Sequence, residues 1–372
     1  MLLFQEQVLR VVTEIAGLSW AQAERVRKGI SKFQAKEMAA LRLAFVLGCQ
    51  RPPPDGPAFT PAQAETLWEQ VSAFAGYGFN QGHATAYADV SYRSAYLKTH
   101  YPAEFLCARL AGHGGFHHPA IYMAEARRLG IGTRAPHVNF SGRKFVLTRL
   151  EIRNWRLEVD AQSAIVNPQS AILWMGLGQI RDLRRKSVKE IVEKRPFRSL
   201  PDLLDKVNLQ AKEITHLIQC GALDGLGESR AAMLAAAAEI LRAGNARQMS
   251  FGFGQETAVP PESPAQRFEW ETHLLGLPMS LHPLDLVKQR PKTLPIRQLP
   301  DYVGKRVTLA GARLPGWTGG KGFFLDDGDS YIIVRGLDKE RPAVWRAVVV
   351  NGRLRQDEWG TTWFQAESAT LV

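Results

Sequence analysis

The stretch GYGFNQGHATAYADVSYRSAYLKTHYPAEF, residues 76–105, carries the strongest local signal in this chain. Three glycines crowd its first seven residues, and a run without glycine or proline then extends from His83 to Tyr101. That pattern predicts a helix over roughly 82–99, and Pro102 is placed to open a second helix over 102–111.

On a helical wheel, His83, Tyr87, Ser91, Ser94 and Lys98 fall within about 80° of one another. Such a stripe, reached through a glycine-rich entry, suits a phosphate-bearing ligand and a base. A solvated helix face with a single hydrogen bond to the histidine would look the same. Upstream, ERVRKGISKF (24–33) adds cations at a density that suits a triphosphate or a nucleic-acid backbone; these are Arg25, Arg27, Lys28 and Lys32.

Composition also favours a polyanionic partner. The 372 residues include 47 Lys and Arg against 36 Asp and Glu, a net charge of +11, and the length suggests two to four domains at about 150 residues each. No apolar run is long enough to span a membrane, and the start lacks the basic region of a secretory signal. Three widely separated cysteines fit a reducing compartment. The sequence therefore predicts a cytoplasmic protein with no membrane partner.

Periodicity predicts a multidomain α+β chain that is mostly helical and ends in a small all-β barrel. Two helices are expected within 5–48, and Thr60 should cap a helix that starts at Pro61. Further helices are expected over 119–129 and within 184–243, with a few short strands or an irregular connector between 131 and 175. Regularly spaced strands with glycine turns fill the last 70 residues, as in an OB-type barrel.

The segment GALDGLGESRAAML (221–234) matches a helix–hairpin–helix motif. In that motif, Gly225 and Gly227 let the backbone approach a DNA phosphate, and the amides of the next helix start bind the anion. A degenerate copy lies in 176–195, where Asp182 and Arg184 stand at the glycine positions. Two such units would track phosphates without reading bases. A plain αα-hairpin with a glycine C-cap is the alternative for each.

The remaining motifs are short. QMSFGF (248–253), inside a Gly-, Pro- and Ser-rich segment, suits a peptide that plugs a partner's pocket, unless it folds back on its own domain. The acidic run at 326–329 is expected to be a hairpin turn and HGGFHH (113–118) a loop that ends a helix, so no metal site is predicted. Basic and aromatic residues of the barrel suit stacking on single-stranded bases, although core packing explains some of them.

Six segments occur in an order that resembles the C-terminal half of the bacterial C-family DNA polymerases. They are LLFQEQVLRVV, AERVRKGISKF, the block from 76 to 110, HVNFSGRKF, LIQCGALDGLG and ETHLLGLPMSLHPLD. The resemblance implies fingers over 1–135, a connector over 136–175 and tandem helix–hairpin–helix units over 176–243. It further implies a linker with a clamp-binding peptide over 244–266, a helical connector over 267–300 and an OB-fold over 301–372.

The resemblance also implies roles for individual residues. The expected nucleotide-binding residues are Arg27, Lys28, Lys32, Asn80, His83, Tyr87 and Lys98. The expected DNA-binding residues are Arg184, Arg185, Lys186, Gly225, Gly227, Arg230, Arg313, Trp317, Lys321 and Phe323. The expected clamp-binding residues are Gln248, Phe251 and Phe253, with Phe251 where the family more often has Leu.

The family's three catalytic aspartates lie in a palm domain ahead of the fingers. The resemblance therefore implies that this chain holds no catalytic or metal-binding residue and binds no cofactor alone, with Mg²⁺ expected for the complete polymerase. DNA, dNTP, the sliding clamp and a separate palm-bearing fragment are the expected partners. The alternative is a non-catalytic accessory protein that binds DNA and the clamp.

Overall fold

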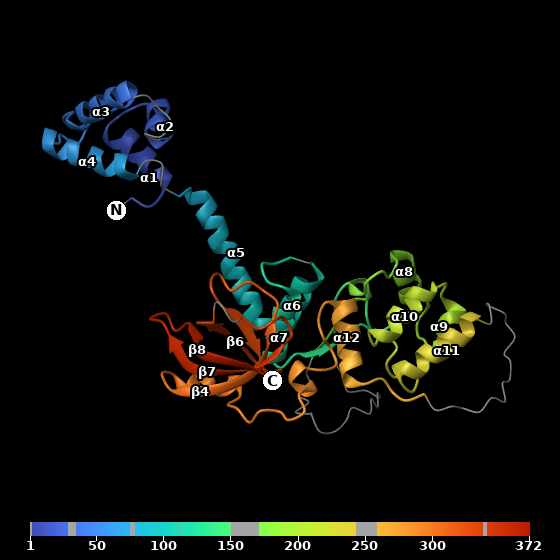
Figure 1. The fold of residues 1–372 in the computed structure, drawn as a ribbon. Helices are drawn as coiled ribbons and strands as arrows, with labels where there is room; N and C mark the ends of the chain where they lie inside the picture. The colour runs from blue at the N-terminus through green and yellow to red at the C-terminus, as the bar shows by residue number, and fades with distance from the viewer. Residues whose placement is uncertain are drawn as a thin grey trace, which may run out of the picture. The chain divides into compact units, whose positions relative to one another are not determined.

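A computed structural model describes residues 2–28, 35–74, 79–112, 114–149, 171–242, 259–337 and 341–372 (Figure 1). The chain forms two compact units, Met1–Leu97 and Lys98–Val372. The boundary falls within the long helix α5 (Gln81–His100). Among the described residues, no helix has the length and apolar character needed to cross a membrane.

The first unit is a small helical bundle. It contains α1 (Gln5–Arg10), which continues into a π-helical turn (Val11–Ile15), then α2 (Trp20–Lys28), α3 (Ala35–Cys49) and α4 (Pro61–Phe74). Its hydrophobic core includes Phe45 and Trp68, whose ring centroids lie 5.3 Å apart. The sequence predicted only two helices over 5–48. The periodic stretch is broken at Gly17, where φ is +65°.

The predicted cap of α4 is present. The Gln63 backbone N–H donates to Thr60 Oγ1 at 3.3 Å, and the Thr60 backbone N–H donates to Gln63 Oε1 at 2.9 Å. This reciprocal pair satisfies amides that the first helical turn leaves without partners.

The second unit begins with α6 (Pro102–Ala111), α7 (Pro119–Arg128) and a three-stranded sheet in the order β1-β3-β2. In this sheet β1 (Gly132–Arg134) runs parallel to β3 (Ala171–Trp174), and β2 (Val146–Arg149) runs antiparallel to it. HGGFHH does end a helix as predicted, since its described residues lie between α6 and α7. Helices α8 (Arg185–Lys194), α9 (Leu200–Lys206), α10 (Ala211–Gln219), α11 (Arg230–Arg242) and α12 (Pro264–Leu275) follow.

These helices and the small sheet share one hydrophobic core. Leu173 on β3, Ile191 on α8 and Leu217 on α10 are fully buried in it. A loop after β1 ties the parts together, because Asn139 exchanges two 2.8 Å hydrogen bonds with the backbone of Phe197. The two hairpins therefore belong to one packed body.

The chain ends in a closed five-stranded barrel with strand order β4-β5-β6-β8-β7 (Figure 1). Its strands are β4 (Arg306–Leu314), β5 (Phe323–Asp326), β6 (Tyr331–Arg335), β7 (Ala347–Gln356) and β8 (Thr362–Leu371). The β6–β8 pair is parallel and the other pairs are antiparallel. Short 3₁₀ helices at Pro283–Leu286 and Ile296–Tyr302 precede the barrel, and the second contributes Ile296 and Leu299 to its core.

This arrangement confirms the predicted fold class, mostly helical with a helix–hairpin–helix region and then an OB-type barrel. The acidic run after Leu325 is the β5–β6 turn, as predicted. Gly328 has φ +97° there, and Asp327 Oδ1 accepts from the backbone N–H groups of Asp329 and Ser330 at 3.0 and 2.8 Å.

Candidate nucleic-acid interface

The start of α5 is anchored to α1 within the first unit. The Gln5 backbone N–H donates to Phe79 O at 2.9 Å, and the Gln81 backbone N–H donates to Glu6 Oε2 at 2.9 Å. Asn80, expected at the nucleotide, caps the helix, because its Oδ1 accepts from the His83 backbone N–H at 2.8 Å. No residue of α5 is buried.

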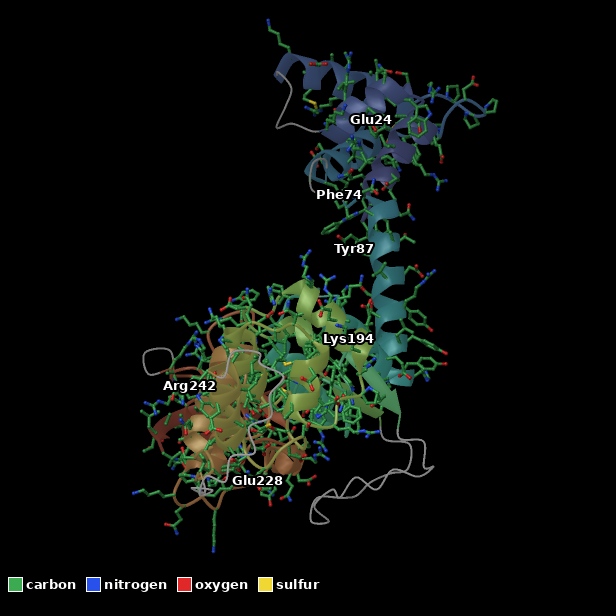
Figure 2. The ribbon with its side chains drawn as sticks, turned by 90° about the vertical axis from the view of Figure 1, so that its right-hand side faces the viewer. Glu24, Phe74, Tyr87, Lys194, Glu228 and Arg242 are labelled. Carbon is green, nitrogen blue, oxygen red and sulfur yellow. The ribbon has the colours of Figure 1, made fainter. Side chains whose placement is uncertain are left out.

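Along α5, His83 and Tyr87 form a ring pair with centroids 4.5 Å apart. Both side chains are exposed, and Tyr87 stands out from the helix in Figure 2. Glu6 and Asp89 line a shallow hollow beside Gln81 and Gly82. That carboxylate-bearing side of α5 is unfavourable for a polyphosphate, whereas the His83–Tyr87 side carries the predicted stripe.

Lys98, the last residue of the predicted stripe, belongs to an ion network around Glu125. Its Nζ lies 2.8 Å from Oε1 of Glu125, a carboxylate whose side chain is 6% exposed. Burial alone would raise the pKa of Glu125, but hydrogen bonds from Arg128 and Lys98 lower it to about 2. Lys98 thus neutralises a buried carboxylate while its side chain stays 46% exposed, and its nucleotide contact remains a prediction.

The predicted cations of α2, Arg27 and Lys28, also form ion pairs, both with Glu24. The Arg27 guanidinium bonds Glu24 at 2.7 Å and Gln5 Oε1 at 2.9 Å, which joins α2 to the α1 end that holds α5. Lys28 Nζ lies 4.0 Å from Glu24 and its side chain is 53% exposed. Lys32 lies outside the described residues. Of the predicted residues of this unit, the structure thus brings Arg27 and Asn80 to the region where α1 meets α5.

The hairpin between α10 and α11 has the backbone that its glycines predict. Gly225 has φ +85°, and a side chain there would meet nothing within 4 Å. A side chain at Gly227 would start 2.8 Å from Met233 Cγ. Gly225 is therefore required by the bend and Gly227 by the packing of α11.

Arg230 is the centre of a buried ion cluster at this hairpin. Its side chain is 2% exposed, with Nε and Nη2 at 2.9 and 2.7 Å from Asp224 and Nη1 at 2.9 Å from both Gln219 O and Glu271 Oε1. The guanidinium makes four hydrogen bonds within the protein. The predicted DNA contact of Arg230 is corrected to a structural role.

The start of α11 is capped by the protein's own oxygens. Glu262 Oε2 accepts from the Ala231 N–H at 3.0 Å, and Ser229 Oγ accepts from the Ala232 N–H at 3.0 Å. Arg267 holds Glu262 in place at 2.6 Å. These two amides are therefore not available to a phosphate, contrary to the motif-based expectation, and an acidic residue, Glu228, lies at the exposed hairpin tip (Figure 2).

The degenerate first hairpin keeps the bend without its glycine. Asp182 has φ +61°, a conformation that Asp tolerates better than most residues, and its carboxylate lies 2.8 Å from Lys212 Nζ. Arg184 anchors the next helix, because its backbone N–H and Nη2 bond Glu213 at 2.9 and 2.7 Å. Arg185 and Lys186 are exposed on the first turn of α8. Exposed positive charge is therefore concentrated at this hairpin.

The predicted barrel residues separate into buried and exposed ones. Phe323 is 1% exposed and packs in the barrel core, so the structure contradicts its predicted contact with DNA. Arg313 is partly buried, its Nη1 donates to Pro342 O at 2.6 Å, and burial lowers its pKa. Trp317 and Lys321 are exposed on the β4–β5 loop.

The structure leaves two further predictions, the clamp-binding peptide and the absence of a metal site, untested. Gln248, Phe251 and Phe253 lie outside the described residues. Within the part of the chain that the structure describes, no group of three His, Cys, Asp or Glu side chains is arranged to hold a metal ion.

The chain resembles known proteins along most of its length. A family model described as the bacterial DNA polymerase III alpha subunit finger domain matches residues 1–52, and a helix-hairpin-helix motif model matches residues 130–233. DNA polymerase III subunit alpha of Helicobacter pylori is 34% identical over 66% of this chain, and that of Vibrio cholerae is 31% identical over 76%. The error-prone DNA polymerase of Corynebacterium glutamicum is 31% identical over 83%.

This chain spans only 20–28% of the length of those relatives. Among solved structures, the hypothetical protein ygiW from E. coli aligns with 23% of this chain and 94% of its own, at 13% identity and a TM-score of 0.20, which is too low to support a fold assignment. The two matched models, the relatives and the order of helices, hairpins and barrel agree. The chain belongs to the bacterial DNA polymerase III alpha-subunit family, which includes error-prone polymerases, and corresponds to its fingers-to-barrel part.

Proposed function

We propose that this chain binds primer-template DNA and supports DNA-directed DNA synthesis as the fingers-to-barrel part of a replicative or error-prone polymerase. The observation that carries the proposal is the first hairpin, where the bend at Asp182 leads into a helix whose first turn exposes Arg185 and Lys186. Exposed cations at a helix start attract a phosphate through both their own charge and the helix dipole.

We assign duplex contact to the first hairpin more than to the second. The second hairpin has the motif's glycines, but its arginine is buried and a carboxylate caps its helix. The first has lost the glycines and retained exposed positive charge. Because phosphate contact dominates non-specific DNA affinity, charge is the better guide to which hairpin binds.

For the nucleotide, we propose that His83 and Tyr87 face the incoming dNTP, with Arg27, Lys28 and Lys32 near its triphosphate and Asn80 fixing the helix start. For the clamp, we propose that Gln248, Phe251 and Phe253 form the tethering peptide. Nucleotidyl transfer uses two Mg²⁺ ions held by carboxylates. We therefore propose that polymerisation needs a palm-bearing part, whether a separate chain or the remainder of a longer one.

DNA binding is tested by fluorescence anisotropy with a labelled duplex across a salt series. We expect Arg185→Glu to weaken binding and to reduce the slope of log K against log salt by about 1. Lys189→Glu is the matched control, since it makes the same charge change one helical turn farther from the hairpin. Equal losses in both variants would refute the assignment to the hairpin, and salt-independent binding by the unaltered chain would refute the electrostatic proposal.

The polymerase role is tested by primer extension with a separately prepared palm-bearing fragment. Extension only when both parts are present supports the proposal. Clamp binding that Phe253→Ala abolishes, together with no rescue of extension, would instead support a non-catalytic accessory protein.

A further inference from the structure

Two adjoining hollows lie where α12, the 3₁₀ helix at Pro283–Leu286 and the start of β7 meet the end of β8. The larger has a volume of about 690 Å³, and its lining includes Phe268 of α12 and Val344, which precedes β7. The smaller, of about 450 Å³, is lined in part by residues 369–371 of β8. Arg346 lines both, so the two hollows form one continuous surface.

Much of this surface is apolar and open to solvent. Leu286 and Val287 line the larger hollow and are half-buried. Around them, Val344, Leu371 and Val372 remain 39%, 65% and 50% exposed. Exposed apolar side chains scattered singly need no explanation, but several gathered around a hollow indicate an interaction site.

Positive charge borders the apolar side chains. Lys288 and Arg346 are exposed, and neither forms an ion pair with another described residue. The residues that line the two hollows, all of them described, include no Asp or Glu. Since charge complementarity at an interface favours the right partner and speeds association, the ligand that fits carries apolar side chains together with negative charge.

The end of β8 offers an open backbone edge. Residues 369–371 pair with residues 348–350 of β7, whereas β6 pairs with β8 only at Phe364 and Gln365. On the side away from β7, the described part of the chain therefore supplies no strand partner for the end of β8. Such an edge accepts an extended peptide, whose alternate side chains point to the same face.

The segment between the hollows is held in one conformation. Trp345 has φ +63°, a conformation that few residues with a Cβ adopt. Its backbone N–H donates to Arg313 O at 2.8 Å, and the Arg313 backbone N–H donates to Arg346 O at 3.2 Å. Arg313 Nη1 also donates to Pro342 O at 2.6 Å. A surface fixed before its ligand arrives binds at a lower entropic cost.

We propose that this surface binds an extended, acidic segment of a partner protein in which apolar and acidic residues alternate. The backbone of the segment pairs with the open edge of β8, its apolar side chains enter the hollows, and its carboxylates face Lys288 and Arg346. The residues that line the hollows belong to neither hairpin, nor to β5 or the β4–β5 loop. The inference is independent of the proposed DNA binding and adds a protein partner to it.

The test measures binding of labelled, amidated peptides to the full chain by fluorescence anisotropy. One peptide alternates Asp with Leu, a second alternates Lys with Leu, and a third alternates Asp with Ser. We expect the Asp/Leu peptide to bind at least about tenfold more tightly than either of the others, because only this peptide matches both the charge and the apolar side chains of the surface.

Charge reversal tests the contact directly. Arg346→Glu should weaken binding of the Asp/Leu peptide by about tenfold and strengthen binding of the Lys/Leu peptide, a gain that a loss of folding would not produce. Arg355→Glu is the matched control, because it makes the same change at an exposed position near the other end of β7, and it should alter neither affinity. Val344→Ser should weaken the Asp/Leu peptide, whereas Val303→Ser, at a 45% exposed valine outside the hollows, should not.

Equal binding of the three peptides to the unaltered chain would overturn the proposal, as would equal losses in Arg346→Glu and Arg355→Glu. An Arg346→Glu variant that loses affinity for DNA and not for the peptide would also overturn it, because that result assigns the cation to a nucleic-acid backbone. Selective peptide binding by an unaltered chain that binds no DNA would support this inference and count against the proposed function.

Discussion

Replacing Arg230 with Met should destabilise the second unit strongly. The substitution removes hydrogen bonds of 2.7–2.9 Å to Asp224, Gln219 O and Glu271, and leaves the Glu271 carboxylate, 0% exposed, without its cation. The Met279 and Ser280 N–H groups still donate to Glu271 at 2.7 and 2.8 Å, which limits the loss. Breaking a buried pair on one side typically costs about 3–5 kcal/mol.

Equilibrium urea unfolding provides the assay, with tryptophan fluorescence as the readout. For a slope of about 2–3 kcal/mol per molar urea, the midpoint should fall by about 1–2 M. Arg242→Met is the matched control, because it makes the same change at the exposed end of the same helix (Figure 2) and should shift the midpoint little. Adding Glu271→Gln to Arg230→Met should recover part of the lost stability, since it removes the uncompensated charge.

An unfolding free energy for Arg230→Met within about 0.5 kcal/mol of the unaltered chain would refute this reasoning. So would a variant that folds normally and loses only DNA affinity, because that is the result expected of a surface arginine on a phosphate.

Three further substitutions test other contacts. Burial alone would raise the pKa of Glu213 above its ordinary 4.5, but hydrogen bonds, led by that from Arg184, lower it to about 2. The ionised carboxylate therefore stabilises the folded state fully above pH 4.5, and this contribution should be lost as the pH falls from 4.5 to 2. In Glu213→Gln, the fall in unfolding free energy between pH 4.5 and 2 should be smaller by about 2–3 kcal/mol, as measured by urea unfolding at each pH. Gly225→Ala should cost about 1–2 kcal/mol in the same unfolding assay, since its φ of +85° disfavours a Cβ. Arg127→Met leaves the buried Asp326 carboxylate, 2% exposed, without its cation and should accelerate hydrogen exchange of the β5 backbone amides. Unchanged exchange rates in β5 would contradict a stabilising role for this ion pair.

Sequence patterns located the elements better than the environments of side chains. The start of α4, the β5–β6 turn and the barrel follow from local signals, because caps, glycine turns and strand alternation act over a few residues. Lys98 and Arg230 look alike in sequence, as cations on or beside helices. Lys98 pairs with Glu125, 27 positions away, and Arg230 pairs with Glu271, 41 positions away. Such pairings depend on tertiary contacts that no local pattern encodes.

The two hairpins show why a motif's glycines are an incomplete guide to its function. A glycine in a tight bend allows a backbone conformation with positive φ, and another residue can adopt that conformation instead. Asp182 adopts the same left-handed conformation at φ +61°, paired with Lys212, while Arg184 and Glu213 pin the next helix start. A non-glycine residue in this conformation costs about 1–2 kcal/mol, which these contacts can offset. Attraction to phosphate, by contrast, comes from exposed positive charge or from free amides at a helix start, and two amides at the start of α11 already bond to Glu262 and Ser229. We therefore propose the hairpin that departs from the motif, with its exposed Arg185 and Lys186, as the DNA-binding one, whereas the buried Arg230 of the other hairpin contributes to the core.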